Sequence, residues 1–98
     1  MPNLYVMAKV KSKLGETQKA KNILTRLAEN SEKESGCLSY QILFSGEDTD
    51  TFMTLEVWDS KESEQKHWQE PHLKETLKAL EPILAEEPRI EKYQVTSD

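Results

Sequence analysis

Two histidines stand near each other in the sequence, and an imidazole is the side chain best suited to move protons near neutral pH. His67 follows Trp58 by nine residues, and His72 directly follows Pro71. An imidazole can take a proton from a phenol or from an activated carbon, so His67 is the leading candidate for a general base. The structural alternative is a surface histidine on a polar helix. His72 could orient a substrate oxygen or simply complete the first turn of a helix.

Three further side chains could line a substrate pocket, and each also has a structural explanation. Glu56 could act as a second catalytic base, or its carboxylate could fix a neighbouring donor, because a carboxylate is costly to bury unpaired. Trp58 offers a flat wall for an aromatic substrate and, equally, a large apolar surface for the core. Tyr40 could line the same pocket, although its apolar neighbours on the strand are typical of a core tyrosine.

A metal site is a weaker interpretation of these residues. His67, His72 and Glu56 lack the tight ligand spacing that is typical of metal-binding motifs, so we expect no metal ligands among them. Cys37 is the single cysteine of the chain and has no evident metal-ligand partners. We expect it to pack as a small hydrophobic side chain.

The periodicity of apolar residues predicts the elements that position these side chains. In chain order they are a strand over 4–11, a helix from Glu16 to near Gly36, strands over 38–44 and 51–58, a short polar helix over 61–70, a helix that starts at Pro71 and bends near Pro82, and a strand over 89–95. This order predicts an α+β fold of the ferredoxin-like βαββαβ type. The short helix has only Trp68 as a large apolar side chain, so we expect it to bury little.

Two helices can cover only one face of a four-stranded sheet. We expect Leu38 and Tyr40 to share one face of the second strand, and a stripe of leucines to bury the last helix: Leu73, Leu77, Leu80 and Leu84. The opposite sheet face also carries large apolar residues. A second copy related by a two-fold axis is the simplest cover for it, which predicts a homodimer through the sheet face.

Composition limits the classes of function. The 98 residues carry a net charge of −5, with 32% charged and 36% hydrophobic residues, as expected of a single domain over 1–98 in which about 96–98 form a disordered tail. The negative charge disfavours nucleic-acid binding. No apolar stretch is long enough for a membrane span, and one unpaired cysteine agrees with a reducing compartment. We therefore expect a cytoplasmic protein.

A set of spaced residues resembles a known family. Glu56, Trp58 and Ser60, followed by His67 and the pair Pro71-His72, are similar to the strand-to-helix signature of the antibiotic biosynthesis monooxygenase family, which is also called quinol-monooxygenase-like. Gly15 after the first strand and the run Gly36-Cys37-Leu38-x-Tyr40 are also similar. The resemblance implies a dimeric α/β barrel whose pocket lies between sheet and helices in each subunit.

What the resemblance implies about activity leaves three alternatives. The first is a cofactor-independent monooxygenase of a small quinol or phenolic substrate, in which the deprotonated substrate itself reduces dioxygen. The second is an isomerase of a small phosphorylated diketone in signal-molecule breakdown, which a lysine or Arg89 near the pocket would favour. The third is a non-catalytic module that binds a small ligand. Heme-degrading relatives resemble this chain less, because Ala8 and Leu77 stand where they have an asparagine and a heme-ligating histidine, and leucine offers no lone pair to iron.

Overall fold

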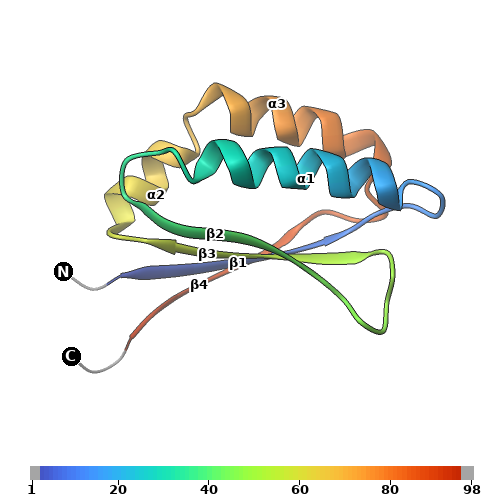
Figure 1. Ribbon diagram of the computed structural model, residues 1–98, viewed down its shortest axis with the longest axis horizontal. Helices are drawn as coiled ribbons and strands as arrows, with labels where there is room; N and C mark the ends of the chain where they lie inside the picture. The colour runs from blue at the N-terminus through green and yellow to red at the C-terminus, as the bar shows by residue number, and fades with distance from the viewer. Residues whose placement is uncertain (1–2, 96–98) are drawn as a thin grey trace.

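A computed structural model describes residues 3–95 and confirms the predicted order of elements (Figure 1). These are β1 (Leu4–Lys11), α1 (Thr17–Ser31), β2 (Cys37–Phe44), β3 (Thr51–Trp58), α2 (Lys61–His67), α3 (Pro71–Leu80), a 3-10 helix η1 (Glu81–Ile83) and β4 (Arg89–Gln94). The four strands form an antiparallel sheet in the order β2-β3-β1-β4, which is the ferredoxin-like arrangement. The predicted disordered tail at 96–98 lies outside the described residues.

All three α-helices lie on one side of the sheet, with α1 and α3 next to each other (Figure 1). The core fills the space between these two layers. Its buried apolar side chains alternate along β1 and β3 as predicted and meet those of the helices: Leu4, Val6, Val10, Ala20, Leu24, Leu27, Phe52, Trp58, Leu73, Leu80 and Ile83. The polar residues Thr54 and Glu56 occupy the same face of β3 and are also buried. A polar patch is therefore built into the centre of the core.

The start of β2 departs from the predicted alternation. The pairing of β2 with β3 shifts register between Cys37 and Ser39, and an extra residue at such a bulge reverses the alternation of side chains. Leu38 is therefore 57% exposed, whereas Tyr40 is buried, and the prediction that both lie on the same face of the strand is wrong. Cys37 instead lies opposite Trp58 and packs against the core as a small hydrophobic side chain.

The helices differ from the prediction in length and in what they bury. α1 ends at Ser31 rather than near Gly36, so a loop of four residues precedes the glycine. α2 buries the polar side chains Glu64 and His67, and the prediction that it buries little is wrong. On α3, Leu73 and Leu80 are buried as predicted, but Leu77 is 39% exposed. The 3-10 helix η1 contains Pro82, which shortens the last turn of α3 as predicted.

The helix-free face of the sheet carries several large apolar side chains and lacks a covering layer in the described part of the chain. Side chains on this face from β1, β2 and β3 are half-buried or exposed: Tyr5, Met7, Leu43, Met53, Leu55 and Val57. Among residues 3–95, no helix combines the length and the hydrophobicity that crossing a membrane requires.

Candidate active site

The loop between α1 and β2 is clamped onto the first turn of α2. Gly36 has φ of +89°, and a Cβ at this position would lie 2.5 Å from the Cβ of Ser63 and 2.8 Å from Oδ1 of Asp59. The carbonyl of Gly36 also accepts a hydrogen bond of 2.8 Å from the backbone N–H of Asp59. Only glycine allows this approach. The clamp brings Glu34, two residues earlier, beside the end of α2.

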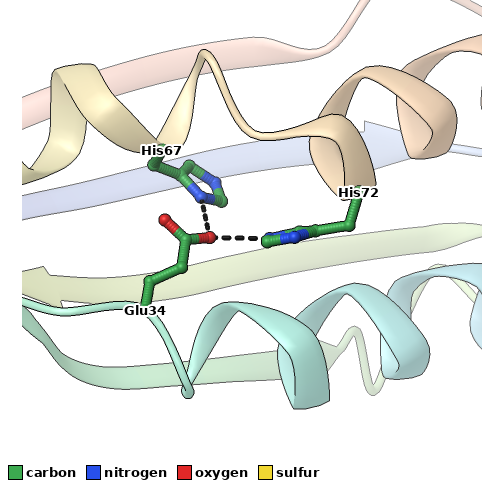
Figure 2. A group of neighbouring side chains, drawn as sticks. All are labelled: Glu34, His67 and His72. Carbon is green, nitrogen blue, oxygen red and sulfur yellow. Dashed lines mark hydrogen bonds and ion pairs between the residues drawn. The ribbon is translucent and has the colours of Figure 1, made fainter.

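Glu34 hydrogen-bonds to the imidazole of His67 at Nδ1. The Oε2 atom of Glu34 lies 2.7 Å from Nδ1 of His67 (Figure 2), and the His67 side chain is 3% exposed. An ionised carboxylate can only accept a hydrogen bond, so against such a carboxylate Nδ1 keeps its proton and Nδ1–H donates the hydrogen bond to Glu34. Within residues 3–95, Nε2 of His67 forms no hydrogen bond with the protein. Nε2 is therefore the ring nitrogen with a lone pair for an incoming molecule.

His72 approaches the same carboxylate oxygen from the start of α3. Its Nε2 atom lies 2.6 Å from Oε2 of Glu34 (Figure 2), and its side chain is 22% exposed. Pro71 occupies the first position of α3, where its fixed φ suits a helix start. The structure thus brings the two predicted histidines together, with ring centroids 6.1 Å apart. The acid that contacts both histidines is Glu34, whereas the sequence analysis considered Glu56 as the acidic member of the site.

His67 faces an apolar pocket between the sheet and α1 and α3. The pocket has a volume of about 60 Å³, and its walls come mainly from aliphatic side chains of β1, α1 and α3. The polar groups among its lining residues are few, and they include three of the predicted site residues: Tyr40, Glu56 and His67. An apolar cavity with a few convergent polar groups is the common form of a small-molecule site.

Glu56 uses both of its carboxylate oxygens within the core. Oε1 accepts a hydrogen bond of 3.0 Å from Nε1 of Trp58, and Oε2 accepts one of 2.7 Å from Oγ1 of Thr54. Thr54 in turn accepts a hydrogen bond of 3.0 Å from the backbone N–H of Ala8. Burial raises the pKa of Glu56, although its two hydrogen bonds act in the opposite direction. These contacts match the structural interpretation, in which Glu56 fixes a neighbouring donor.

Aromatic rings surround His67 on the sheet side. The ring of Trp58 lies 4.8 Å from the imidazole of His67, and the ring of Tyr40 lies 5.7 Å from it, centroid to centroid. Trp58 is fully buried and Tyr40 is 4% exposed. Burial, followed by the nearby Glu56 carboxylate, raises the pKa of Tyr40 far above its ordinary value. The hydroxyl of Tyr40 therefore stays protonated at any pH at which the protein would work.

A second buried carboxylate lies on α2, next to Trp68. Glu64 is 3% exposed, and its Oε2 accepts a hydrogen bond of 2.6 Å from Nε1 of Trp68 and forms an ion pair of 3.0 Å with Nζ of Lys92 on β4. The ammonium of Lys92 also lies 5.9 Å from the centre of the Trp68 ring. Trp68, which lines the pocket, is thereby held in one orientation between α2 and β4.

A wider groove adjoins the pocket between α3 and β4. The two share five lining residues: Trp68, Leu77, Leu80, Pro88 and Ile90. The rest of the groove includes three exposed carboxylates: Glu81, Glu86 and Glu87. The shared walls make the groove the natural entrance, and its outer rim is acidic. Arg89 lies in a neighbouring depression with Lys9 and Lys11, and this depression shares Glu86 and Glu87 with the groove.

The positions compared with heme-degrading relatives both belong to this pocket. Ala8 and Leu77 are among its lining residues. Neither side chain can ligate iron.

Sequence reasoning missed Glu34 and Glu64. Glu34 lies in the charged stretch Glu32-Lys33-Glu34, which is typical of a solvated loop, and Glu64 lies in a helix that is polar throughout. Their burial depends on contacts with distant residues, because Glu34 meets His67 and His72 more than thirty positions later. The local signal that could have pointed to Glu34 is Gly36, whose positive φ marks a tight approach.

The fold and pocket define a ferredoxin-like α+β protein with a sheltered imidazole, and the comparisons identify its family. The family model described as antibiotic biosynthesis monooxygenase matches residues 3–79, and the chain belongs to this family. A solved structure of a conserved protein from Methanosarcina mazei Go1 is 30% identical, with a TM-score of 0.89 over 95% of this chain and 92% of that chain.

Two more distant structures show the fold alone. One, described as a possible oxidoreductase from Bacteroides thetaiotaomicron, is 23% identical with a TM-score of 0.89, over 96% of this chain and 98% of that chain. The other is a candidate antibiotic biosynthesis monooxygenase from Nitrosomonas europaea, 19% identical with a TM-score of 0.92, over 96% of this chain and 90% of that chain. No curated protein matches the chain.

Proposed function

We propose that this protein is a cofactor-independent monooxygenase of a small quinol or phenolic substrate. The observation that carries the proposal is the setting of His67, whose Nδ1 is bonded to Glu34 while its ring lines an apolar pocket. This arrangement fixes the tautomer in which Nε2 accepts a proton. Family membership adds support, because the family includes monooxygenases.

In the proposed reaction, Nε2 of His67 takes the proton of the substrate hydroxyl. The resulting phenolate is electron-rich and reduces dioxygen, and one oxygen atom enters the substrate while the other leaves as water. A phenol with a free para position would become a quinone, since C₆H₆O and O₂ give C₆H₄O₂ and H₂O. The apolar walls exclude water and disfavour the charged phenolate unless it lies beside the imidazolium that forms.

The other predicted site residues position side chains or bind the substrate, and they do not accept the substrate proton. Trp58 packs beside His67 but is not among the residues that line the pocket, and Glu56 fixes Trp58 through its Nε1, so we assign Glu56 a positioning role. Tyr40 stays protonated and can donate a hydrogen bond to a substrate oxygen. His72 shares Glu34 with His67 and does not line the pocket, so we assign it the role of holding Glu34 in place.

Oxygen consumption with a panel of reduced quinols and phenols tests the proposal. We expect wild-type protein to accelerate oxygen uptake above autoxidation for at least one compound, and ¹⁸O₂ to label the product at one atom. Replacement His67→Gln should lower the turnover number by about 100-fold or more, within the 10²–10⁴-fold that general base catalysis contributes. Uptake equal to autoxidation for every compound would refute the proposal.

The charged residues around the pocket entrance distinguish the isomerase alternative from the oxygenase. A phosphorylated diketone needs a basic site, but the entrance groove carries Glu81, Glu86 and Glu87, and the neighbouring depression that holds Arg89 is lined by Glu86 and Glu87 as well. Among residues 3–95, no lysine or arginine lines the pocket. These charges favour a neutral substrate and support the oxygenase. An isomerase would consume no oxygen, and a non-catalytic binding module would keep its ligand affinity in the His67→Gln variant.

We also propose that two copies pair through the helix-free face of the sheet. The apolar side chains of that face, Leu55 and Val57 among them, are partly exposed in a single chain, and a patch of this kind is typical of an association surface. Sedimentation should give a dimer for wild-type protein and a single subunit for Leu55→Lys. Lys78→Glu on the exposed face of α3 is the matched control and should remain dimeric. A well-folded wild-type protein that sediments as one subunit would contradict this pairing.

A further inference from the structure

We propose that Glu34, His67 and His72 form a binding site for a divalent cation of the zinc type. Each residue offers one ligand atom, and the three atoms lie within 4.8 Å of one another. Oε2 of Glu34 contacts both Nδ1 of His67 and Nε2 of His72. They come from three different segments, the α1–β2 loop and the facing ends of α2 and α3, and point toward one another (Figure 2). The site does not depend on the proposed monooxygenase activity.

The distances suit a cation after a small movement. In a tetrahedral zinc site with bonds of about 2.0–2.1 Å, neighbouring ligand atoms are about 3.3 Å apart. Oε2 of Glu34 now lies 2.7 and 2.6 Å from the two nitrogens. Each ligand atom would have to shift by less than about 1 Å to reach this geometry. Small side-chain rotations supply such a shift without moving the elements.

The donor set selects the kind of ion. Two imidazole nitrogens and one carboxylate oxygen are the ligands of many zinc sites that keep a fourth position for water, whereas Mg²⁺ and Ca²⁺ prefer oxygen alone. His72 is 22% exposed, while Glu34 and His67 are 9% and 3% exposed. The cation would therefore enter past His72 and take its fourth ligand, a water molecule, from that side.

The surroundings hold two of the ligands in place. The approach of Gly36 to Ser63 anchors the segment that carries Glu34. The backbone carbonyl of His72 accepts a hydrogen bond of 2.7 Å from Oγ1 of Thr76 at the start of α3. Anchored ligands lose little freedom when they bind an ion, which favours binding over the hydrogen-bonded state.

Cation binding would change the chemistry of His67 if the proposed function is right. An ion on Nδ1 replaces its proton, so the remaining proton of the neutral ring resides on Nε2. The N–H at Nε2 then faces the pocket as a hydrogen-bond donor, and Nε2 can no longer accept a proton from the substrate. The cation would act as an inhibitor of the oxygenase. This consequence rests on the proposed function, whereas the binding itself does not.

Calorimetric titration of the chelator-treated, tag-free protein with ZnCl₂ tests the site directly. We expect one equivalent of Zn²⁺ per chain for the wild type. Glu34→Gln and His72→Gln should each weaken binding by more than about 100-fold, since even changes outside the ligand shell cost 10–100-fold. Glu32→Gln, an exposed acid of the same loop, is the matched control and should change affinity by less than about twofold. Circular dichroism confirms that each variant is folded.

Spectroscopy on the wild-type protein tests the proposed cation site without variants. His67 and His72 are the two histidines of the chain, so long-range ¹H–¹⁵N spectra should show coordination shifts at Nδ1 of one ring and Nε2 of the other when Zn²⁺ is added. Co²⁺ should give the bands of a four- or five-coordinate site without thiolate. Three results would overturn the proposal: no saturable binding at millimolar Zn²⁺, unchanged affinity in both ligand variants, or a thiolate band that places the ion on Cys37.

Discussion

Gly36→Ala should destabilise the protein more than any other single-methyl addition at a glycine. At φ of +89° an alanine costs about 1–2 kcal/mol relative to glycine. Its Cβ would also collide with the Cβ of Ser63 at 2.5 Å and with Oδ1 of Asp59 at 2.8 Å, and forced packing of this kind costs about 1–3 kcal/mol. The total loss in free energy of unfolding is therefore about 2–5 kcal/mol.

Gly15→Ala provides the matched control for the backbone contribution. Gly15 has φ of +85°, and a Cβ there would meet no atom within 4 Å. This variant should lose only the backbone cost of about 1–2 kcal/mol. The difference between the two variants isolates the collision of the α1–β2 loop with α2.

Urea unfolding at a fixed protein concentration measures both variants, since a dimer makes stability depend on concentration. The double variant Gly36→Ala/Ser63→Gly removes the Cβ that blocks the loop and should recover part of the loss, apart from about 1 kcal/mol for glycine in a helix. If Gly36→Ala were no less stable than Gly15→Ala, the loop would not be clamped on α2, and the placement of Glu34 would lose its explanation.

Three further predictions concern single side chains. Burial raises the folded-state pKa of Glu56 above its ordinary value of 4.5, so the contribution of Glu56 to stability is full below the unfolded pKa and is lost as pH rises through the folded pKa. Urea titrations should show wild type losing stability relative to Glu56→Gln over that window. The pKa of Cys37, raised mainly by burial to about 11 from 9.0, should slow alkylation at pH 8 about 100-fold relative to the unfolded chain. Leu77→Ala should raise kcat/KM for bulkier quinols, whereas Leu77→Trp should lower it, as measured by oxygen uptake.

The fold could be predicted from the sequence because its signals are local. Alternation in β1 and β3 and the leucines of α3 each identify an element from a single window of residues. The same reasoning failed at Leu38, because a bulge inserts one residue without any change of composition. It also failed at Leu77, which has the correct helical spacing but lies where the pocket opens toward the groove.

The candidate site could be predicted only in part. His67 and Tyr40 line one pocket, and Trp58 packs against both of them without lining it. Glu34 could not be found, because its function as a partner of both histidines depends on three segments that meet only in the folded chain. Glu64 was missed for the same reason, since its partner Lys92 belongs to the last strand. Within a polar segment, nothing in the local sequence distinguishes a buried charged residue from an exposed one.

The size of the pocket determines how a substrate must enter. An apolar cavity of roughly 150 Å³ is known to hold benzene, but the pocket beside His67 has a volume of only about 60 Å³. A phenol therefore needs additional space, and the adjoining groove, which shares the walls Leu77, Leu80 and Ile90, is where that space lies. Leu77 and Ile90 are about 40% exposed, so both can turn outward without breaking the core. Substrate entry thus requires movement of side chains between α3 and β4, while Glu34, His67 and Trp58 stay fixed behind it.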